Sequence, residues 1–293
     1  MDKKDKSVVF SEASKSLREH LSPFAVTVID TDNTHDLEHG NAKIFSGTLV
    51  QIGDKLLVAT ASHCIHSDRA CNHYWILGDQ PRSKSEGVPK ILAAWNTPGD
   101  SPDVGILEVE RSSWPQFSSK TACPLSRIRI VGIGRTRRSL SLLGSPIEYA
   151  KIEKNRCPRG LTAVLISYST VALDKSEWKK YTICPPPDPT TDIILEYPAG
   201  TDQTVHLDTG NPVELPDPSG MSGGGLWDHG FGVNGLNLLW CPDNAFLFGI
   251  QSAWHPTERY IRGVQIIHWL RLVNDNYPEL RGLLSQQFPE LAS

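Results

Sequence analysis

Short apolar runs of strand length recur along the first half of the chain, and Gly, Asp, Asn or Pro separates one run from the next. These runs occupy residues 25–30, 44–51, 56–62, 91–95 and 104–109. Ahead of them, Leu17 and Leu21 lie four positions apart among polar residues, which predicts one short amphipathic helix over 12–21. We therefore predict a first β domain over 25–118 that follows an N-terminal extension over 1–24.

A second series of such runs fills the rest of the chain, at residues 127–134, 147–154, 162–169, 193–197, 204–207 and 246–253. It predicts a second β domain over 119–262. Prolines are concentrated in residues 184–192, where they remove backbone donors and predict an exposed loop. Apolar residues then recur with helical spacing from Val264 to Val273, so we expect a C-terminal helical segment over 263–293. The predicted fold class is all-β.

Composition narrows the classes of function. The 293 residues carry 29 basic and 33 acidic side chains, a formal net charge of −4, so the basic surface of a nucleic-acid-binding protein is not expected. Residues 1–16 are charged and polar, without the apolar stretch of a secretory signal, and no apolar run is long enough to span a bilayer. We therefore expect a cytoplasmic protein with no membrane or nucleic-acid partner, whose six cysteines are free thiols.

Three local patterns, in chain order, could carry chemistry. His63 follows the apolar run LLVATAS, Asp103 opens the run that ends at Val109, and Ser222 lies among four glycines in PSGMSGGGLW. Each alone has an ordinary structural reading as a packed imidazole, a turn aspartate or a glycine-rich turn. Together they supply a hydroxyl nucleophile, an imidazole to take its proton and a carboxylate to fix the imidazole tautomer, which predicts a Ser–His–Asp catalytic centre.

The same residues carry a resemblance to a known family. TASHC at 60–64, DVGILEV at 103–109 and GMSGGGLW at 220–227 resemble, in the same order, the triad motifs of the chymotrypsin-like (trypsin-like) serine peptidases. LFGIQSAW at 247–254 resembles the family strand that binds the substrate backbone, and YIRGVQIIHWL at 260–270 resembles its last strand and C-terminal helix. Five ordered matches over most of the chain are more specific than any one of them.

The resemblance implies two six-stranded antiparallel β-barrels with the active site between them. It implies that Ser222 is the nucleophile, His63 the general base and acid, and Asp103 the carboxylate that orients the imidazole. The backbone N–H groups of Gly220 and Ser222 would form the oxyanion hole. Ser252 matches the serine that the family places beside the aspartate. No metal or cofactor is implied, and the expected partner is a protein or peptide substrate cleaved through an acyl-enzyme.

Two departures from the family pattern bear on regulation. The strand IFSGTL offers Ser46 rather than a cysteine that could bridge to Cys64, which favours a reducing compartment. Met221 stands where many members have the aspartate that pairs with a new N-terminus after zymogen cleavage, and no activation sequence like IVGG is present. We therefore expect control by a regulatory protein partner or a ligand rather than by cleavage.

The sequence signal for the substrate-binding residues is less specific than that for the triad. Pro216 stands six positions before Ser222, where a trypsin carries its basic-selective aspartate, and Asp217 follows it, so a preference for Lys or Arg is not supported. Ser252, Ala253 and Trp254 match the family segment that lines the specificity pocket. The bulk of Trp254 would narrow that pocket for small or modest side chains.

Three alternative functions are also compatible with the sequence. Cys64, His66, Cys71 and His73 form two C-x-H pairs whose ligand types suit zinc. The G-x-S-x-G pattern at 220–224 also fits an α/β-hydrolase, although that fold needs strand–helix alternation before the serine. The third alternative is a catalytically silent scaffold or binding module that keeps the triad residues.

Overall fold

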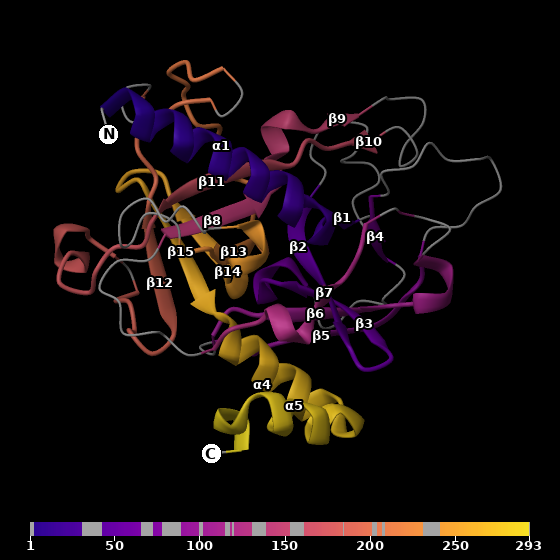
Figure 1. Ribbon diagram of the computed structural model, residues 1–293. Coiled ribbons are helices and arrows are strands. Elements are labelled where there is room, and N and C mark those ends of the chain that lie inside the picture. Colours follow the sequence, from indigo (N-terminus) through magenta and orange to yellow (C-terminus); the bar gives the residue numbers. More distant parts are fainter. Residues whose placement is uncertain are drawn as a thin grey trace.

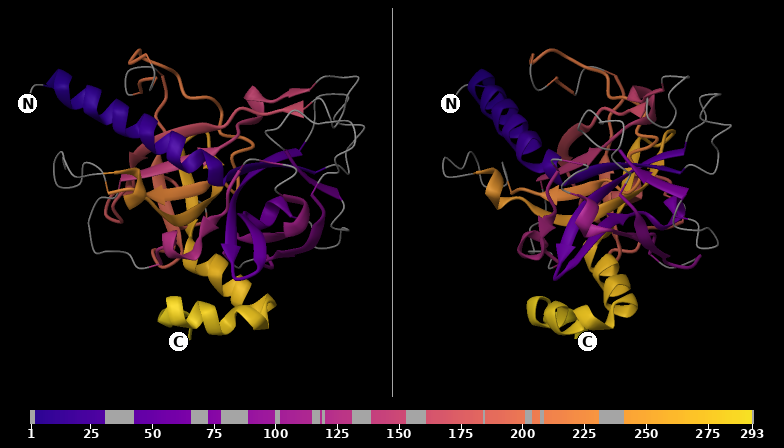
Figure 2. Two further views of the ribbon diagram at one scale, coloured as in Figure 1. Left: turned by 45° about the vertical axis from the view of Figure 1, so that its right-hand side comes forward. Right: turned by 90° about the vertical axis from the view of Figure 1, so that its right-hand side faces the viewer.

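The computed structural model describes the chain over residues 3–30, 43–65, 73–77, 89–99, 102–114, 118, 120–130, 139–152, 161–183, 185–200, 204–206, 209–230 and 241–292. Two curled antiparallel sheets lie side by side, with one long helix at the N-terminal end and short helices at the C-terminal end (Figure 1). The two sheets form separate lobes in both views of Figure 2, with the C-terminal helices beneath them. The predicted all-β class, with helices confined to the ends, is confirmed.

The first sheet is built from the predicted runs of the first half. Its strands are β1 (Ala25–Asp30), β2 (Lys43–Ile52), β3 (Lys55–Thr60), β4 (Tyr74–Ile76), β5 (Ile91–Asn96) and β6 (Gly105–Val109), in the order β4-β1-β2-β3-β6-β5. A two-residue strand, β7 (Cys123–Pro124), pairs in parallel with β2. Every residue of β1 and of β6 is buried, including the polar Thr27, Asp30 and Glu108, so both faces of each strand are covered.

The second sheet has six strands as well. They are β8 (Ser139–Gly144), β11 (Ile166–Val171), β12 (Asp192–Glu196), β13 (Gly225–Asp228), β14 (Phe246–His255) and β15 (Tyr260–Gln265), in the order β11-β8-β13-β14-β15-β12. A single bridge between Ala172 and Leu195 brings the two ends of this order together, so the sheet curls on itself. A separate pair, β9 (Lys151–Ile152) with β10 (Leu161–Thr162), stands apart from it.

Some strand predictions in the second half are wrong. Of residues 127–130, predicted as a strand start, Arg127 ends a 3-10 helix, and the rest make one bridge within the described chain, from Ile128 to Leu247. Residues 147–149 form a 3-10 helix after Pro146 instead of a strand. Strand β8 was not predicted, although the alternation of its serines and leucines is typical of a strand. Residues 131–134 and 153–154 lie outside the described part of the chain.

The terminal helices join the two sheets. α1 (Lys3–Leu21) begins nine residues before the predicted helix, and both Leu17 and Leu21 are buried. The Phe24 ring stacks on Trp227 of the second sheet with ring centroids 5.6 Å apart. At the other end, α4 (Ile266–Asn276) and α5 (Arg281–Gln287) follow the second sheet, and Trp269 Nε1 donates a 3.0 Å hydrogen bond to the carbonyl of Gly105 in the first.

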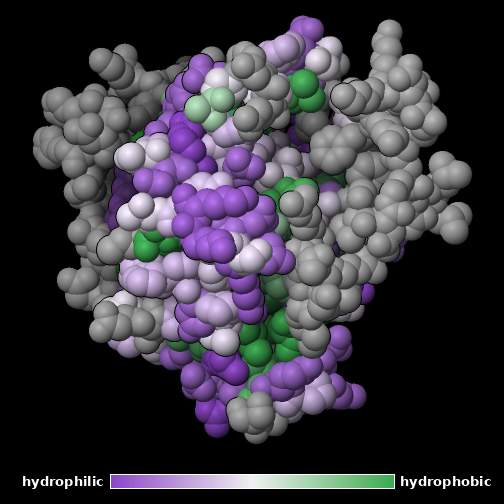
Figure 3. All heavy atoms as spheres, turned by 90° about the vertical axis from the view of Figure 1, so that its left-hand side faces the viewer, coloured by the Kyte–Doolittle hydropathy of each residue, from purple (hydrophilic) through white to green (hydrophobic). Residues whose placement is uncertain are grey.

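The face in Figure 3 is mostly hydrophilic, and its apolar atoms gather in its lower part, close to the C-terminal end of the molecule. This distribution is ordinary for a surface helix pair packed on a core. Of the helices within the described ranges, none combines the length and the apolar composition needed to cross a membrane. The proposed domain boundaries at residues 24, 118 and 262 remain predictions.

Candidate active site

The topology of the first sheet brings His63 and Asp103 together. His63 lies in the 3-10 helix Ser62–Cys64 that directly follows β3, and Asp103 lies two residues before β6. β3 and β6 are antiparallel neighbours, with Thr60 opposite Gly105, so the chain leaves one strand where it enters the other. The imidazole Nδ1 lies 2.7 Å from Asp103 Oδ2, and the backbone N–H of His63 donates a 3.0 Å hydrogen bond to Oδ1.

The carboxylate sets the protonation of the imidazole. The hydrogen bond to Asp103 is the main cause that raises the pKa of His63 to about 10, and the Cys64 thiol adds to it while burial opposes it. The side chain of His63 is 49% exposed and that of Asp103 31% exposed, so both can be reached by a substrate. The pair therefore holds an imidazolium firmly, which is the state that a histidine base enters when it accepts a proton.

Ser222 lies in a tight loop that both sheets hold in place. Its carbonyl accepts a 2.8 Å hydrogen bond from the backbone N–H of Ser46 in β2, and the next N–H, that of Gly223, donates to the carbonyl of Gln251 in β14 at 2.8 Å. Gly223 has a φ of 88°, and a Cβ there would collide with Thr60 Oγ1 and the carbonyl oxygen of Ser46. Glycine is therefore required at this position by both backbone conformation and space.

The two predicted oxyanion donors are uncommitted. Within the described residues, the backbone N–H groups of Gly220 and Ser222 donate to no acceptor. The carbonyl of Ser219 accepts a 2.8 Å hydrogen bond from the N–H of Ile147, and a trans peptide then points the Gly220 N–H to the opposite side. Ser46 Oγ donates a 2.9 Å hydrogen bond to the carbonyl of Gly220 and so fixes the following peptide.

The thiol of Cys64 lies between the imidazole and the serine loop. Its Sγ is 3.6 Å from His63 Nε2 and 4.0 Å from the carbonyl oxygen of Ser222. In the part of the chain that the structure describes, Ser222 Oγ makes no hydrogen bond to the imidazole. The structure thus joins His63 to Asp103 and brings the serine loop beside them, with Cys64, 1% exposed, at the junction. Sequence reasoning missed this contact, because it depends on how the ring is turned.

Ser252 has a different partner from the expected one. Its hydroxyl donates a 3.1 Å hydrogen bond to the carbonyl of Arg262 on β15, and no hydrogen bond joins it to Asp103, which is also a described residue. The register of β14 against β15 shifts between Gln251 and Ala253, so Ser252 lies at a bulge of β14. Ala253, half-buried, lies opposite Arg262.

The other predicted specificity residues meet around Tyr197. The Tyr197 hydroxyl donates a 2.7 Å hydrogen bond to the carbonyl of Pro216, and its ring packs edge-on against Trp254 with centroids 5.0 Å apart. Asp217 Oδ1 accepts from the N–H of Ser219 at 2.8 Å and from its hydroxyl at 2.5 Å, so Asp217 shapes the turn that leads into Gly220.

Arg259 completes this group and was not predicted. Its guanidinium carbon lies 5.2 Å from the Trp254 ring centroid, and its Nη2 donates a 2.7 Å hydrogen bond to the carbonyl of Pro198. Burial acts to raise the pKa of Asp217, but the hydrogen bonds from Ser219, with a smaller effect of the Arg259 charge, hold that pKa below its usual value. Arg259 has a φ of 56°, a turn conformation that its sequence does not signal.

The structure describes only two of the four residues of the zinc alternative, Cys64 and His73. His66 and Cys71 lie outside the described residues, and within those residues no three His, Cys, Asp or Glu side chains gather as a metal site. The described cysteines Cys64, Cys123 and Cys241 are free thiols.

No protein-family model and no curated protein sequence matches the chain. Among solved structures, it is similar to an inactivated protease paralogue of the scabies mite, at 13% identity and a TM-score of 0.53, over 88% of this chain and 96% of that one. It is also similar to a thermostable serine protease from an extremophilic microorganism, at 16% identity and a TM-score of 0.47, over 90% and 98% of the two chains. The first likeness establishes a chymotrypsin-like fold, and at such identity it establishes the fold alone.

Proposed function

We propose that the protein is a serine endopeptidase that cleaves peptide bonds through Ser222, His63 and Asp103. The observation that carries the proposal is the Asp103 carboxylate, which holds both the Nδ1 and the backbone N–H of His63 at 2.7 and 3.0 Å, beside a glycine loop with two uncommitted amides. This arrangement supplies a base with a fixed tautomer and donors for a developing oxyanion.

In the proposed reaction, Ser222 Oγ attacks the carbonyl carbon of the scissile peptide while its proton passes to His63 Nε2. The negative charge of the tetrahedral intermediate falls on the former carbonyl oxygen, where the N–H groups of Gly220 and Ser222 stabilise it by about 3 kcal/mol each. His63 then gives the proton to the leaving amine, the C–N bond breaks and an acyl-enzyme remains. Water activated by His63 hydrolyses that ester and restores the Ser222 hydroxyl.

This cycle needs one local adjustment. The Ser222 hydroxyl must take the position at His63 Nε2 that faces the Cys64 thiol at 3.6 Å. Catalytic hydrogen bonds are often longer or poorly aligned before substrate binds.

We also propose that no zymogen cleavage is needed. Met221 is 0% exposed and belongs to an apolar cluster with Leu226 and Tyr197, so no charged group at this position awaits a new N-terminus. We propose instead that a protein partner or a ligand regulates the enzyme, in the cytoplasm. The enzyme needs no cofactor or metal and acts on protein or peptide substrates rather than on nucleic acid or a membrane.

The group around Trp254 bears on substrate choice. The Arg259 guanidinium lies against Trp254 and its charge acts on the carboxylate of Asp217, so that carboxylate is already partly neutralised and is a weak counter-charge for a cationic side chain. Substrates with Lys or Arg at the cleaved position are therefore expected to be poor ones.

The second candidate function is a catalytically silent scaffold. The observation that favours it is the contact of His63 Nε2 with Cys64 Sγ, together with the lack of a hydrogen bond from Ser222 Oγ to the imidazole among the residues described. The scabies mite relative, whose name calls it an inactivated protease paralogue, shows that this fold also occurs without activity.

Hydrolysis of an unstructured protein, followed by mass spectrometry of the products at several pH values up to 10, separates the two functions. Wild type is expected to generate defined peptides, Ser222→Ala to lose this activity by at least about 10³-fold, and Ser176→Ala, a change at an exposed serine, to keep it. Equal turnover by wild type and Ser222→Ala would contradict the role of Ser222 as nucleophile, and turnover by neither protein would favour the silent scaffold over an enzyme that is active on its own.

A further inference from the structure

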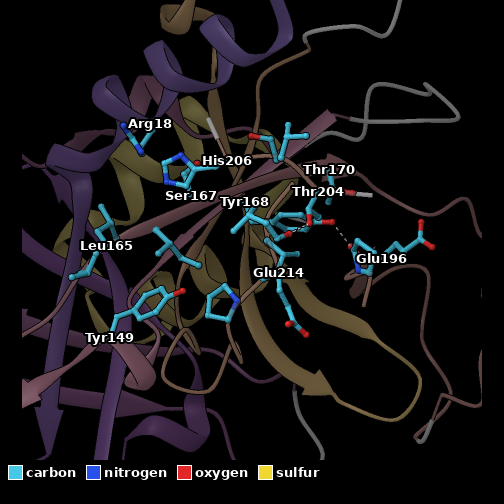
Figure 4. A pocket seen from close by; sticks show the side chains of 18 residues that line it. Arg18, Tyr149, Leu165, Ser167, Tyr168, Thr170, Glu196, Thr204, His206 and Glu214 are labelled. Carbon is cyan, nitrogen blue, oxygen red and sulfur yellow. Dashed lines mark hydrogen bonds between the residues drawn. The ribbon is translucent and has the colours of Figure 1, made fainter. Parts of the chain in front are cut away.

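A cavity of about 540 Å³ lies beside the second sheet and is distinct from the catalytic residues. Its walls are residues 164–170, at and before β11, and the segments 204–206 and 213–216, and Arg18 of α1 reaches its rim. His63, Asp103 and Ser222 do not line it. Figure 4 shows these side chains converging on one space from several elements.

The cavity follows the free edge of a strand. Among the described residues, β11 ends the order of its sheet and pairs with β8 alone over Ile166–Val171, and the sheet closes onto Leu195 of β12 at Ala172, just beyond β11. An antiparallel strand turns alternate N–H and C=O groups to each edge, so the edge away from β8 offers donors and acceptors. Seven consecutive residues, 164–170, line the cavity, and one of them, Ser167, has an Oγ that is buried without a hydrogen-bond partner among the described residues.

Some of the exposed side chains in the walls are apolar. Val164 is 53% exposed, Val205 50% and Tyr149 37%, and all three line the cavity. Burial of these side chains by an occupant would remove apolar surface from water, a favourable contribution. The space suits an occupant that has alternating small apolar side chains and a main chain able to pair with β11.

The charges differ between the two ends. Figure 4 shows Arg18 and His206 near one end, on the side of Leu165, and Glu196 at the other, beyond Thr170, and the exposed side chain of Glu214 lines the cavity as well. An antiparallel peptide on β11 would therefore place its amino-terminal part near Glu196 and its carboxyl-terminal part near Arg18. Charge complementarity then calls for a basic residue early in that segment and an acidic one late.

The cavity also touches the segment that leads to the nucleophile. Leu215 and Pro216 line it, and Asp217 and Ser219 next along the chain form the turn before Gly220. Tyr168, another lining residue, packs against Tyr197 with ring centroids 5.1 Å apart, and the Tyr197 hydroxyl holds the carbonyl of Pro216. An occupant would thus restrain residues 215–216 directly and also through Tyr168 and Tyr197.

We propose that this cavity is a docking site for an extended peptide segment of a protein partner, added antiparallel to β11, with a basic residue toward Glu196 and an acidic one toward Arg18 and His206. Docking raises activity by fixing residues 213–217 and hence the Gly220 amide. The second statement rests on the proposed peptidase function, whereas the docking itself does not.

The docking is tested on the Ser222→Ala protein, which cannot cleave the probe. The probe is the capped, fluorescein-labelled peptide Lys-Thr-Val-Thr-Val-Thr-Asp, and its matched control has the Lys and Asp exchanged. Fluorescence anisotropy is expected to show about tenfold tighter binding of the probe than of the control. Equal affinities, tighter binding of the control, or no binding of either peptide would overturn the proposal.

A charge exchange shows where the probe binds. Glu196→Lys, at an exposed position, is expected to weaken the probe about tenfold and to strengthen, by a similar factor, a peptide whose first Lys is replaced by Asp. This rescue cannot come from misfolding. An unchanged affinity for both peptides would overturn the assigned site.

The coupling is tested on wild type by the rate at which a fluorophosphonate labels the protein, with and without saturating probe. A severalfold faster rate with the probe supports control of the Ser222 loop. Tight binding with an unchanged labelling rate overturns the control and leaves the docking. Binding by a protein that labels under neither condition refutes the peptidase function and not the docking site.

Discussion

The backbone N–H of Ser46 donates a 2.8 Å hydrogen bond to the carbonyl of Ser222, so a strand of the first sheet holds the nucleophile loop of the second. The Ser46 side chain adds two more links, because its Oγ donates to the carbonyl of Gly220 at 2.9 Å and accepts from the N–H of Ser145 at 2.8 Å. One residue therefore positions the loop relative to His63, which belongs to the first sheet.

Replacement of Ser46 by Ala tests this link. The variant keeps the backbone hydrogen bond and loses both side-chain ones, so we expect a loss of about 1–3 kcal/mol in the free energy of unfolding. Because the Gly220 peptide is then less well held, we also expect about a tenfold slower reaction with a fluorophosphonate. Chemical denaturation and labelling kinetics measure the two effects, with Ser176→Ala as the control. A normal labelling rate in Ser46→Ala would show that the hydroxyl does not position the loop.

The raised pKa of His63 predicts an alkaline pH profile. The imidazole can accept the Ser222 proton only when it is neutral, and its pKa of about 10 means that most molecules carry the imidazolium at pH 7. We expect kcat/KM to rise with pH from the neutral range toward 10. A plateau already reached at pH 7 would contradict the strong Asp103–His63 interaction.

The variant Asp103→Asn isolates the cause. It removes the largest contribution that raises the His63 pKa, so the pKa is expected to fall toward the ordinary value of about 6.5. NMR titration of the His63 ring measures this shift directly. The plateau activity is expected to fall by about 10⁴, because the amide no longer fixes the tautomer or stabilises the imidazolium. An unchanged titration would mean that Asp103 does not govern the imidazole.

Two glycines with similar backbone angles should differ sharply on substitution. Gly223 has a φ of 88° and Gly210 one of 67°, but a Cβ on Gly210 meets nothing within 4 Å, whereas one on Gly223 runs into Thr60 and Ser46. We expect Gly210→Ala to cost about 1 kcal/mol of stability and Gly223→Ala more than about 3 kcal/mol. Thermal unfolding of both variants measures the difference, and equal costs would contradict the close approach of the two sheets.

Replacement of the buried Gln251 is expected to stabilise the protein. Its side chain is 0% exposed, and its Oε1 and Nε2 have no hydrogen-bond partner among the described residues. Replacement by Met keeps the length of the side chain and removes the buried amide, so we expect a gain of about 1–3 kcal/mol. The control Gln265→Met removes an exposed amide that donates to Pro189 and should gain nothing. A loss of stability in Gln251→Met would show that the amide is satisfied by bound water.

The sequence predicts the parts of this fold whose burial is continuous. The runs that became β1, β2, β3 and β6 are apolar because both faces of each strand are covered. β8 was not predicted, although Ser139 and Ser141 alternate with leucines as in a strand, and the structure shows how a buried serine is accommodated there: Ser141 Oγ lies 2.6 Å from Ser169 Oγ on β11. Such a cross-strand partner cannot be read from one segment alone.

The candidate site likewise has features that the sequence predicts and features that it does not. The residue types and the family resemblance predict that His63 and Asp103 meet, and each flanks a recognisable run, since His63 follows one run and Asp103 opens another. The contact of Cys64 with His63 Nε2 depends on a side-chain rotamer, and the place of Arg259 beside Trp254 depends on a left-handed residue in a turn. Neither carries a pattern in sequence.

The most direct test of the central claim is covalent labelling by a fluorophosphonate, followed by mass spectrometry to locate the adduct. Such a probe phosphonylates a serine only where a base takes its proton and amides stabilise the oxyanion, so it reports the assembled site rather than the fold. We predict one adduct on Ser222 in wild type and in Ser176→Ala, and none in Ser222→Ala or His63→Ala, in assays at pH 9–10 with and without the docking peptide. An unlabelled Ser222 under all these conditions, or equal labelling in His63→Ala, would contradict the account.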